Sequence, residues 1–316
     1  MTLAIAIVGT GIAGLAAARR LRESGFVCTL FDKSRGLGGR MATRRVDDLH
    51  FDHGAQFFTA RSARFSALVA QWCAAGQAAP WFDDRHVGTP GMSAPVRAML
   101  GGETVVSGCQ VAALHRGPGG WTVATAAGPV GTPGNGAFAA VLLAVPAPQA
   151  RPLAASAGIV FPELAHASYA PCWTLMLGFD APCGLAEDRI RREDGAIAWV
   201  ARNASKPGRA RDREAVVVQA APDWSRAHLE APPDEVAPLL LREFAAATGV
   251  VAAPVHVAAH RWRYALVEET AGRACLWDPG AGLGACGDWC LGARVEAAFE
   301  SGEALADAVS ATLSGR

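Results

Sequence analysis

A glycine-rich turn between an apolar run and a helix pattern constrains this chain more than any other feature. Residues 3–8 are apolar, and GTGIAG follows at once with Gly9, Gly11 and Gly14. A helix pattern comes next, and a second apolar run ends at Asp32, 18 residues after Gly14. This order is typical of dinucleotide binding, in which the helix N-terminus faces the pyrophosphate and the acid bonds a ribose hydroxyl.

Length, composition and charge exclude several classes of protein. The chain has 316 residues, of which 51% are hydrophobic and 18% are charged, as in a globular protein of about two domains. Its 29 Lys and Arg residues balance 29 Asp and Glu residues, so no positive excess recruits nucleic acid or anionic lipid. No stretch reaches the ~18 apolar residues of a membrane span. We expect no nucleic-acid or membrane partner, and a monomer or weak dimer.

The cysteines and lysines limit which metal sites and catalytic residues the chain can have. None of the eight cysteines forms a CxxC pair or a cluster with zinc spacing, so we predict no metal site. Scattered thiols of this kind indicate a cytoplasmic protein with reduced cysteines. Lys33 and Lys206 are the only lysines in the sequence, so a catalytic lysine is one of these two.

Of two segments after Asp32, the first suits a dinucleotide longer than NAD and the second has two interpretations. In GLGGRM, Gly38 and Gly39 allow close backbone approach, and Arg40 supplies a planar fork for pyrophosphate. In FDHGAQFFTAR, the polar residues Asp52, His53 and Gln56 have two interpretations, the edge of a flavin site or an ordinary hairpin turn, and the spacing favours neither.

The C-terminal region predicts a second dipole site. We expect a strand over residues 285–291 that contains Asp288, followed by an amphipathic helix over residues 295–313. The N-terminus of such a helix can stabilise negative charge on a reduced flavin ring. The glycines at 280–284 have no apolar strand before them, so we expect a flexible loop there. Residues 104–125 predict three short strands in a meander.

Together these pieces resemble the flavin-containing amine oxidase superfamily. The resemblance rests on GTGIAG with Asp32, on GLGGRM and on the C-terminal Gly287-Asp288 that precedes the last helix. The segments GRMATRR, FDHGAQFFTAR, ARNASKPGR and HRWRYA, with GDWCLGARVEAAFESG, are most similar to bacterial renalases. The resemblance covers nearly the whole chain.

The resemblance implies an α/β fold in two parts. A Rossmann-like FAD-binding domain of the amine-oxidase (GR2) type would comprise residues 1–75, 97–150 and 269–316. A second α+β substrate domain on an antiparallel sheet would comprise residues 76–96 and 151–268, with the flavin ring between the two.

The resemblance also implies non-covalent FAD and the residues that bind it. Asp32, beside Lys33, would take the adenosine ribose, Val111 the adenine and Asp288 the ribityl chain or phosphate. Gln56 and Phe57 would approach the flavin ring. The remaining implied contacts are with pyrophosphate, at Gly9, Gly11, Ile12, Ala13, Gly14, Gly39 and Arg40, and with the pyrimidine edge of the ring, at Val295, Glu296 and Ala297.

The reaction implied is oxidation of dihydro-NAD(P) isomers, reduced at ring position 2 or 6, to NAD(P)+. Hydride would pass to flavin N5, and dioxygen would be reduced to hydrogen peroxide. An amine oxidase on the same scaffold is the main alternative, but its usual lysine near N5 could only be Lys206, which lies in a polar segment. A non-catalytic flavin-binding regulatory protein is an alternative of another class.

The substrate pocket has two groups of candidate residues. Trp262 and Tyr264 alternate along a predicted strand with His260 on the same side, so they either wall the flavin or pack in a core. Residues in and near the polar segment 202–213 are candidates for substrate contact, with a solvated loop as the alternative. These residues are Trp199, Asn203, Lys206 and Arg209.

Overall fold

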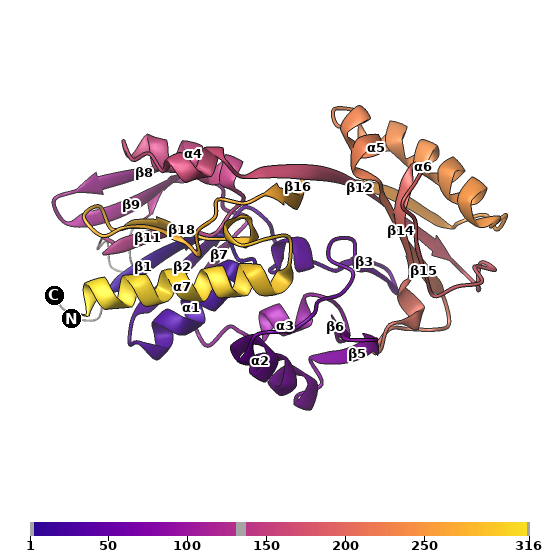
Figure 1. Ribbon diagram of the computed structural model, residues 1–316, viewed down its shortest axis with the longest axis horizontal. Coiled ribbons are helices and arrows are strands. Elements are labelled where there is room, and N and C mark those ends of the chain that lie inside the picture. Colours follow the sequence, from indigo (N-terminus) through magenta and orange to yellow (C-terminus); the bar gives the residue numbers. More distant parts are fainter. Residues whose placement is uncertain (1–2, 131–136, 315–316) are drawn as a thin grey trace.

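The computed structural model describes residues 3–130 and 137–314, so residues 1–2, 131–136 and 315–316 of the predicted FAD-binding domain lie outside the described part. The chain forms two layered units, one around a mostly parallel sheet and one around an antiparallel sheet (Figure 1). Strand β12 (Ser168–Phe179) runs from the first unit into the second, and β16 (His256–Glu269) pairs with it on the way back.

The first unit is built on a six-stranded sheet. In sheet order its strands are β17 (Leu276–Asp278), β18 (Leu283–Ala285), β11 (Ala140–Leu143), β1 (Ala4–Val8), β2 (Val27–Asp32) and β7 (Thr104–Ser107). All pairings are parallel except that of β17 with β18. Because β1 lies between β2 and β11, its C-terminal end is the point where the strand order reverses, which is where open α/β sheets bind ligands.

Helices α1 (Ile12–Glu23) and α7 (Val295–Leu313) pack against each other beside this sheet (Figure 1). Their contact is close, because a Cβ added at Gly302 would lie 2.1 Å from the carbonyl oxygen of Ala13. The prediction of a C-terminal helix over residues 295–313 is confirmed. Helices α2 (Ala63–Ala74) and α3 (Ala94–Arg97) and the 3₁₀ turn η1 (Gly39–Met41) complete this side.

A small three-stranded sheet covers the other side of the first unit. It contains β8 (Val111–Gly117), β9 (Gly120–Thr125) and β10 (Gly128–Val130), with α4 (Ala147–Ser156) and the turn η2 (Pro162–Ala165) nearby. The predicted meander over residues 104–125 is therefore wrong in one respect. Its first strand, β7, pairs with β2 in the main sheet, because the alternating pattern of a short strand does not say which sheet it joins.

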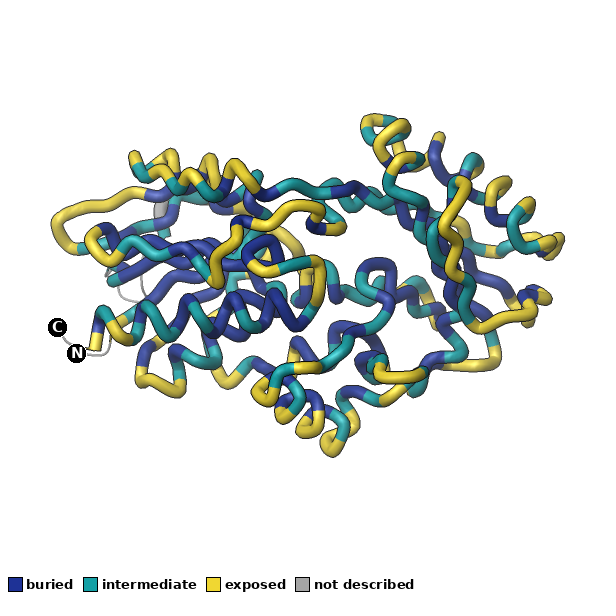
Figure 2. The backbone as a smooth tube through the Cα atoms, viewed as in Figure 1, coloured by how far each residue is buried: buried dark blue, intermediate teal, exposed yellow. Residues whose placement is uncertain are grey.

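The second unit is a five-stranded antiparallel sheet covered on its outer face by two helices. In sheet order the strands are β13 (Arg189–Arg191), β14 (Ile197–Arg202), β15 (Glu214–Ala220), β12 and β16. The helices are α5 (Pro222–Ala227) and α6 (Pro233–Thr248), and their outward sides are exposed (Figure 2). The predicted α/β class, with a Rossmann-like unit and an antiparallel second unit, is confirmed.

Two hairpins connect the units on their inner side. The hairpin of β3 (Arg44–Val46) and β4 (Leu49–Phe51) places Leu49 and Phe51 against the second sheet, and each buried side chain contributes roughly 1.5–3 kcal/mol. The hairpin of β5 (Ala78–Phe82) and β6 (Arg85–Gly88) packs with the first unit, because Ala78 and Val87 lie in the core that contains α1. The same segment also contacts the second unit, because the Gly88 oxygen accepts from Arg209 Nη1 (2.8 Å), so the assignment of residues 76–96 to the second unit stays a prediction.

Two expectations near the C-terminus are wrong. The segment 285–291 is not one strand, because β18 ends at Ala285 and a 3₁₀ turn, η4 (Asp288–Cys290), holds Asp288. In place of the expected flexible loop at 280–284, residues 279–282 form a tight turn between β17 and β18, and residues 283–284 belong to β18. The turn is closed by hydrogen bonds from the backbone N–H groups of Gly280 and Ala281 to Asp278. Apolar residues around a buried turn resemble those of a strand, so the pattern alone did not separate the two.

Candidate functional site

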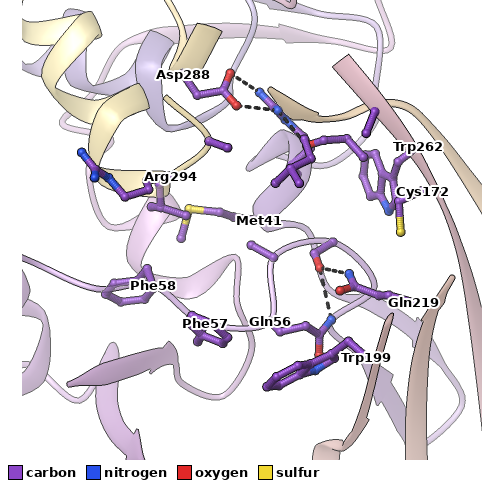
Figure 3. Close-up of a pocket in the computed structure, with 18 of the residues that line it drawn as sticks. Met41, Gln56, Phe57, Phe58, Cys172, Trp199, Gln219, Trp262, Asp288 and Arg294 are labelled. Atoms are coloured by element: carbon purple, nitrogen blue, oxygen red, sulfur yellow. Dashed lines mark hydrogen bonds and ion pairs between the residues drawn. The ribbon is translucent and has the colours of Figure 1, made fainter. Parts of the chain in front are cut away.

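A cavity of about 580 Å³ lies between the two units and meets most of the motifs found in the sequence (Figure 3). At one end it reaches the start of α1, and at the other it reaches the inner face of the second sheet. Its lining residues are Ile12, Gly38, Arg40, Met41, residues 54–59, residues 170–172, Arg191, Arg192, Ala198, Trp199, Gln219, Ala220, Pro222, Trp262, Ala265, Leu266, Asp288, residues 293–295 and Ala298. We call it the central cavity.

The glycine turn is built as a dinucleotide site requires. Thr10 donates from its backbone nitrogen (2.8 Å) and its hydroxyl (2.5 Å) to the Asp32 carboxylate, which ties the acid to the turn. A Cβ at Gly14 would lie 2.1 Å from the Gly9 oxygen, so only glycine allows this contact of helix and strand. A Cβ at Gly11 would meet no protein atom within 4 Å, and no side chain caps the helix there. The open, uncapped end of α1 thus has room for a phosphate.

The predicted adenosine contacts lie around Asp32. Ser107 of β7 pairs with Asp32, and the backbone nitrogen of Cys109 donates to its carbonyl oxygen. This bend brings Val111, the first residue of β8, to the same end of the sheet. Lys33 is exposed beside them.

The GLGGRM segment lies directly against the glycine turn. The Gly38 nitrogen donates to the Thr10 oxygen, and a Cβ at Gly39 would lie 3.5 Å from Gly11 Cα. Arg40 forms a bidentate ion pair with Asp288 (2.7 and 2.6 Å) and donates to the Ala265 oxygen (Figure 3). Two residues that we predicted as separate cofactor contacts therefore bind each other on the cavity wall.

The start of α7 also reaches the cavity, through one predicted residue and one that was not predicted. Val295 and Ala298 line it, being three apart and so on one face of the helix. The side chains of Glu296 and Ala297 are buried and do not line the cavity, so the predicted contact of these two residues with the flavin ring would be made by the backbone at the start of the helix. The Glu296 carboxylate accepts from the backbone nitrogens of Arg61 and Ser62. Burial alone would raise the pKa of Glu296, but these hydrogen bonds outweigh it and hold the pKa below its usual value.

The Gln56 side chain lines the cavity, yet its polar atoms are all engaged by the protein. Its Nε2 donates to the carbonyl oxygens of Asp52 (2.6 Å) and Gly54 (3.1 Å), and its Oε1 accepts from Lys206 Nζ (3.2 Å). Phe57 also lines the cavity, with its ring 5.8 Å from that of Trp199. Both predicted ring contacts are therefore present at the cavity.

Lys206 and Arg209 are buried rather than solvated, which corrects the interpretation of this segment as a surface loop. Lys206 Nζ lies 3.2 Å and Arg209 Nη2 lies 2.6 Å from Asp52 Oδ2, and Asp52 and Lys206 have no exposed surface. Burial alone would raise the pKa of Asp52, but the two cations hold it well below its usual range. Burial lowers the pKa of Lys206 to about 8. We call Asp52, Lys206 and Arg209 the buried charge cluster; neither cation lines the cavity.

Of the three pocket candidates on β16, one lines the central cavity and two do not. Trp262 lines the cavity and donates from Nε1 to the His53 oxygen (2.8 Å). His260 instead packs its ring 4.9 Å from that of His53, and Tyr264 packs against Tyr169, so neither belongs to the lining. Burial lowers the pKa of His260 to about 4, which leaves its ring neutral at pH 7.

Of the four predicted substrate contacts, only Trp199 lines the central cavity. Asn203 is buried and donates to the His50 oxygen (2.6 Å), away from the cavity. The sequence reasoning missed Cys172, Gln219 and the pair Arg191 and Arg192, which do line it. The one available signal was in β15, where Gln219 is a polar residue after the apolar run of residues 215–218.

The charged residues of the cavity wall are mostly cations. Arg40 and Asp288 neutralise each other, and Asp288 is the only carboxylate among the lining residues. Arg191, Arg192 and Arg294 also line the cavity and are exposed; among the described residues none of the three forms an ion pair, and Arg192 Nη1 donates to the Ala247 oxygen (3.3 Å). The central cavity therefore presents an excess of positive charge to whatever enters it.

Two known family patterns match this chain. The pattern of the NAD(P)-binding Rossmann-like domain matches residues 7–72, and that of the flavin containing amine oxidoreductase matches residues 66–310. Because the second match covers more than half of the chain, the protein belongs to the flavin containing amine oxidoreductase family. It is an FAD-dependent oxidoreductase. The open end of α1, the tethered Asp32 and the uncapped start of α7 all fit that cofactor.

Individual relatives are either short matches or distant folds. The 4,4'-diapophytoene desaturase of Staphylococcus haemolyticus is 48% identical over 50 residues, which are 16% of this chain and 10% of that protein. A putative protoporphyrinogen oxidase from Exiguobacterium sp. 255-15 matches with TM-score 0.77 and 16% identity over 98% of this chain and 99% of its own. Cyclohexylamine oxidase from Brevibacterium oxydans matches with TM-score 0.72 and 11% identity, over 99% of this chain and 100% of its own. These structures show a shared fold.

Among the described residues, no group of His, Cys, Asp and Glu side chains could hold a metal ion. In the same part of the chain, no helix has both the length and the apolar character to cross a membrane.

Proposed function

We propose that the protein oxidises isomeric dihydro-NAD(P), reduced at position 2 or 6 of the nicotinamide ring, to NAD(P)+. The observation that carries the proposal is the positive charge of the central cavity. Arg191, Arg192 and Arg294 favour a substrate that carries phosphates and disfavour an ammonium group. The resemblance of residues 51–61 and 201–209 to renalases supports the same substrate.

The chemistry of the wall supports a reaction that needs no acid or base. Hydride loss from a dihydropyridine breaks one ring C–H bond and leaves an aromatic pyridinium, so no proton has to be removed. Cys172 lines the cavity, but burial raises the pKa of its thiol to about 11. The chemistry that FAD supplies when bound is acceptance of hydride at N5 and transfer of both electrons to dioxygen, giving hydrogen peroxide.

The chain's own contribution is binding and orientation. Trp199, Phe57 and Trp262 give the cavity flat apolar walls from both units, which suit a planar ring and exclude water. The unpaired arginines would hold the phosphates. We further propose that it acts in the cytoplasm, since all eight cysteines are free thiols. We also propose that it is a monomer or weak dimer.

The test is anaerobic mixing of the FAD-loaded protein with 6-dihydro-NAD, 2-dihydro-NAD, ordinary 4-dihydro-NADH and a panel of primary and cyclic amines. The flavin absorbance should bleach rapidly with the 2- or 6-dihydro isomer and slowly or not at all with the others. Rapid bleaching by an amine would contradict the proposal and support the amine oxidase alternative. Absence of bleaching by any compound would support a flavin-binding protein without this activity.

A further inference from the structure

Gln219 lines the central cavity in an orientation that the protein itself determines. It lies on β15 between Trp199 of β14 and Thr174 of β12, its neighbours in the sheet. Its Nε2 donates to the carbonyl oxygen of Gly54 across the unit boundary, at 2.7 Å. Because a carbonyl oxygen only accepts hydrogen bonds, the nitrogen end of the amide must face Gly54.

The other end of this amide faces the cavity. Among the described residues, no group donates to Gln219 Oε1, yet this oxygen is not one of the buried atoms without a partner. It therefore retains accessible surface, and Gln219 lies in the cavity wall. The wall thus offers a fixed acceptor with no donor from the protein.

Gln56 provides the contrast. Figure 3 shows its amide nitrogen and that of Gln219 directed at the same backbone oxygen, that of Gly54. The Oε1 of Gln56 accepts from buried Lys206, so none of its polar atoms is left for a ligand. Of these two amides, only Gln219 can take a hydrogen bond from a molecule in the cavity.

We propose that Gln219 is a specificity-determining residue whose Oε1 accepts a hydrogen bond from the carboxamide N–H₂ of the substrate's nicotinamide ring. The inference rests on the proposed function and deepens it. A locked acceptor rejects a ring that brings a second acceptor in place of a donor, because one of the two oxygens then stays unpaired. Trp199 and Trp262 would hold the ring between flat walls while Gln219 sets its rotation.

The test compares NAD+ with 3-acetylpyridine adenine dinucleotide, which has the same charge and ring but a methyl ketone in place of the carboxamide. Dissociation constants for the oxidised, FAD-loaded protein are measured from the perturbation of the flavin absorbance. The wild type should bind NAD+ about three- to tenfold more tightly. Gln219→Leu and the unbranched Gln219→Met should lower this ratio to about one. Gln71→Leu, the same change on the exposed face of α2, should leave it unchanged.

The outcomes separate this inference from the proposed function. If the wild type is reduced by a dihydro-NAD isomer but both Gln219 variants keep the wild-type ratio, the role of Gln219 is overturned and the proposed function stands. If the variants keep that ratio and shift the flavin reduction potential, the acceptor faces the cofactor and the inference is likewise overturned. If neither dinucleotide binds and no isomer reduces the flavin, both proposals fall. Because the second variant keeps the side-chain length, loss of FAD by Gln219→Leu alone does not block the test.

Discussion

Three buried charges, those of the buried charge cluster, make the region behind Gln56 positive. Asp52 balances only one of the two cations, Lys206 and Arg209, and a buried charge is costly unless it is paired. The cluster therefore depends on Asp52 more than on either cation. Lys206 Nζ also lies 5.1 Å from the centre of the Trp81 ring, which adds a favourable contact for its charge.

Asp52→Asn should destabilise the protein by about 3–5 kcal/mol, because it leaves two buried cations without a counter-charge. Lys206→Met should cost less, about 1–2 kcal/mol, because Asp52 and Arg209 stay paired and one bond to Gln56 is lost. Asp223→Asn, at an exposed pair with Arg226, is the matched control and should change stability by less than about 0.5 kcal/mol. Urea unfolding measures all three, and equal effects of the first two variants would refute this ranking.

Two buried histidines, His53 and His260, should make the stability of the folded protein sensitive to acid. Burial, with His260 and Arg44 nearby, lowers the pKa of His53 to about 4, and burial with Arg44 lowers that of His260 to about 4. Between about pH 6.5 and pH 4 the unfolded chain therefore binds more protons, so stability falls as the pH is lowered. The melting temperature should decrease across this range, and the double variant His53→Gln, His260→Gln should have a shallower slope. A slope identical to that of the wild type would show that these rings do not control it.

At the scale of elements, the sequence predicted those helices and strands whose whole pattern lies in one continuous stretch of residues. The strand, glycine turn, helix and Asp32 form one continuous stretch, and α7 shows helical spacing over its whole length. The segment 202–213 could not be interpreted correctly in this way. Its polar residues are typical of a surface loop, but Lys206 is buried because Asp52, far away in the sequence, pairs with it. Gln219 and Arg191 were missed because only the folded sheet brings them to the cavity.

The glycine turn makes a prediction that separates folding from cofactor binding. Gly11→Ala adds a methyl group where no protein atom is near, so stability without FAD should change by less than about 1 kcal/mol. FAD binding should weaken about tenfold or more, because the pyrophosphate needs that space. Gly14→Ala should instead lower stability by about 1–3 kcal/mol through its contact with the Gly9 oxygen. Thermal unfolding of the FAD-free protein and ultrafiltration of FAD provide the two readouts; normal FAD affinity in Gly11→Ala would place the pyrophosphate elsewhere.

At the scale of the whole molecule, the two units have different tasks. The first would hold the FAD along the C-terminal ends of its strands, and the second presents Trp199, Gln219 and the arginines of β13 and its following turn from the opposite side. Long strands β12 and β16 and the buried charge cluster connect the units, so the cavity is shaped by both (Figure 1). We propose that both units contribute to substrate selection, the second unit through Trp199, Gln219 and its arginines and the first through Arg294.

The central claim is that the arginines of the cavity wall hold an anionic substrate. Its most direct test is the second-order rate constant for anaerobic flavin reduction by 6-dihydro-NAD, measured against ionic strength. For the double variant Arg191→Gln, Arg192→Gln, the account predicts a rate constant about tenfold below that of the wild type at low salt. Salt screens the attraction in the wild type, so the two values should converge at high salt. Equal rate constants at low salt, or a faster reaction in the variant, would contradict an anionic substrate held by this wall.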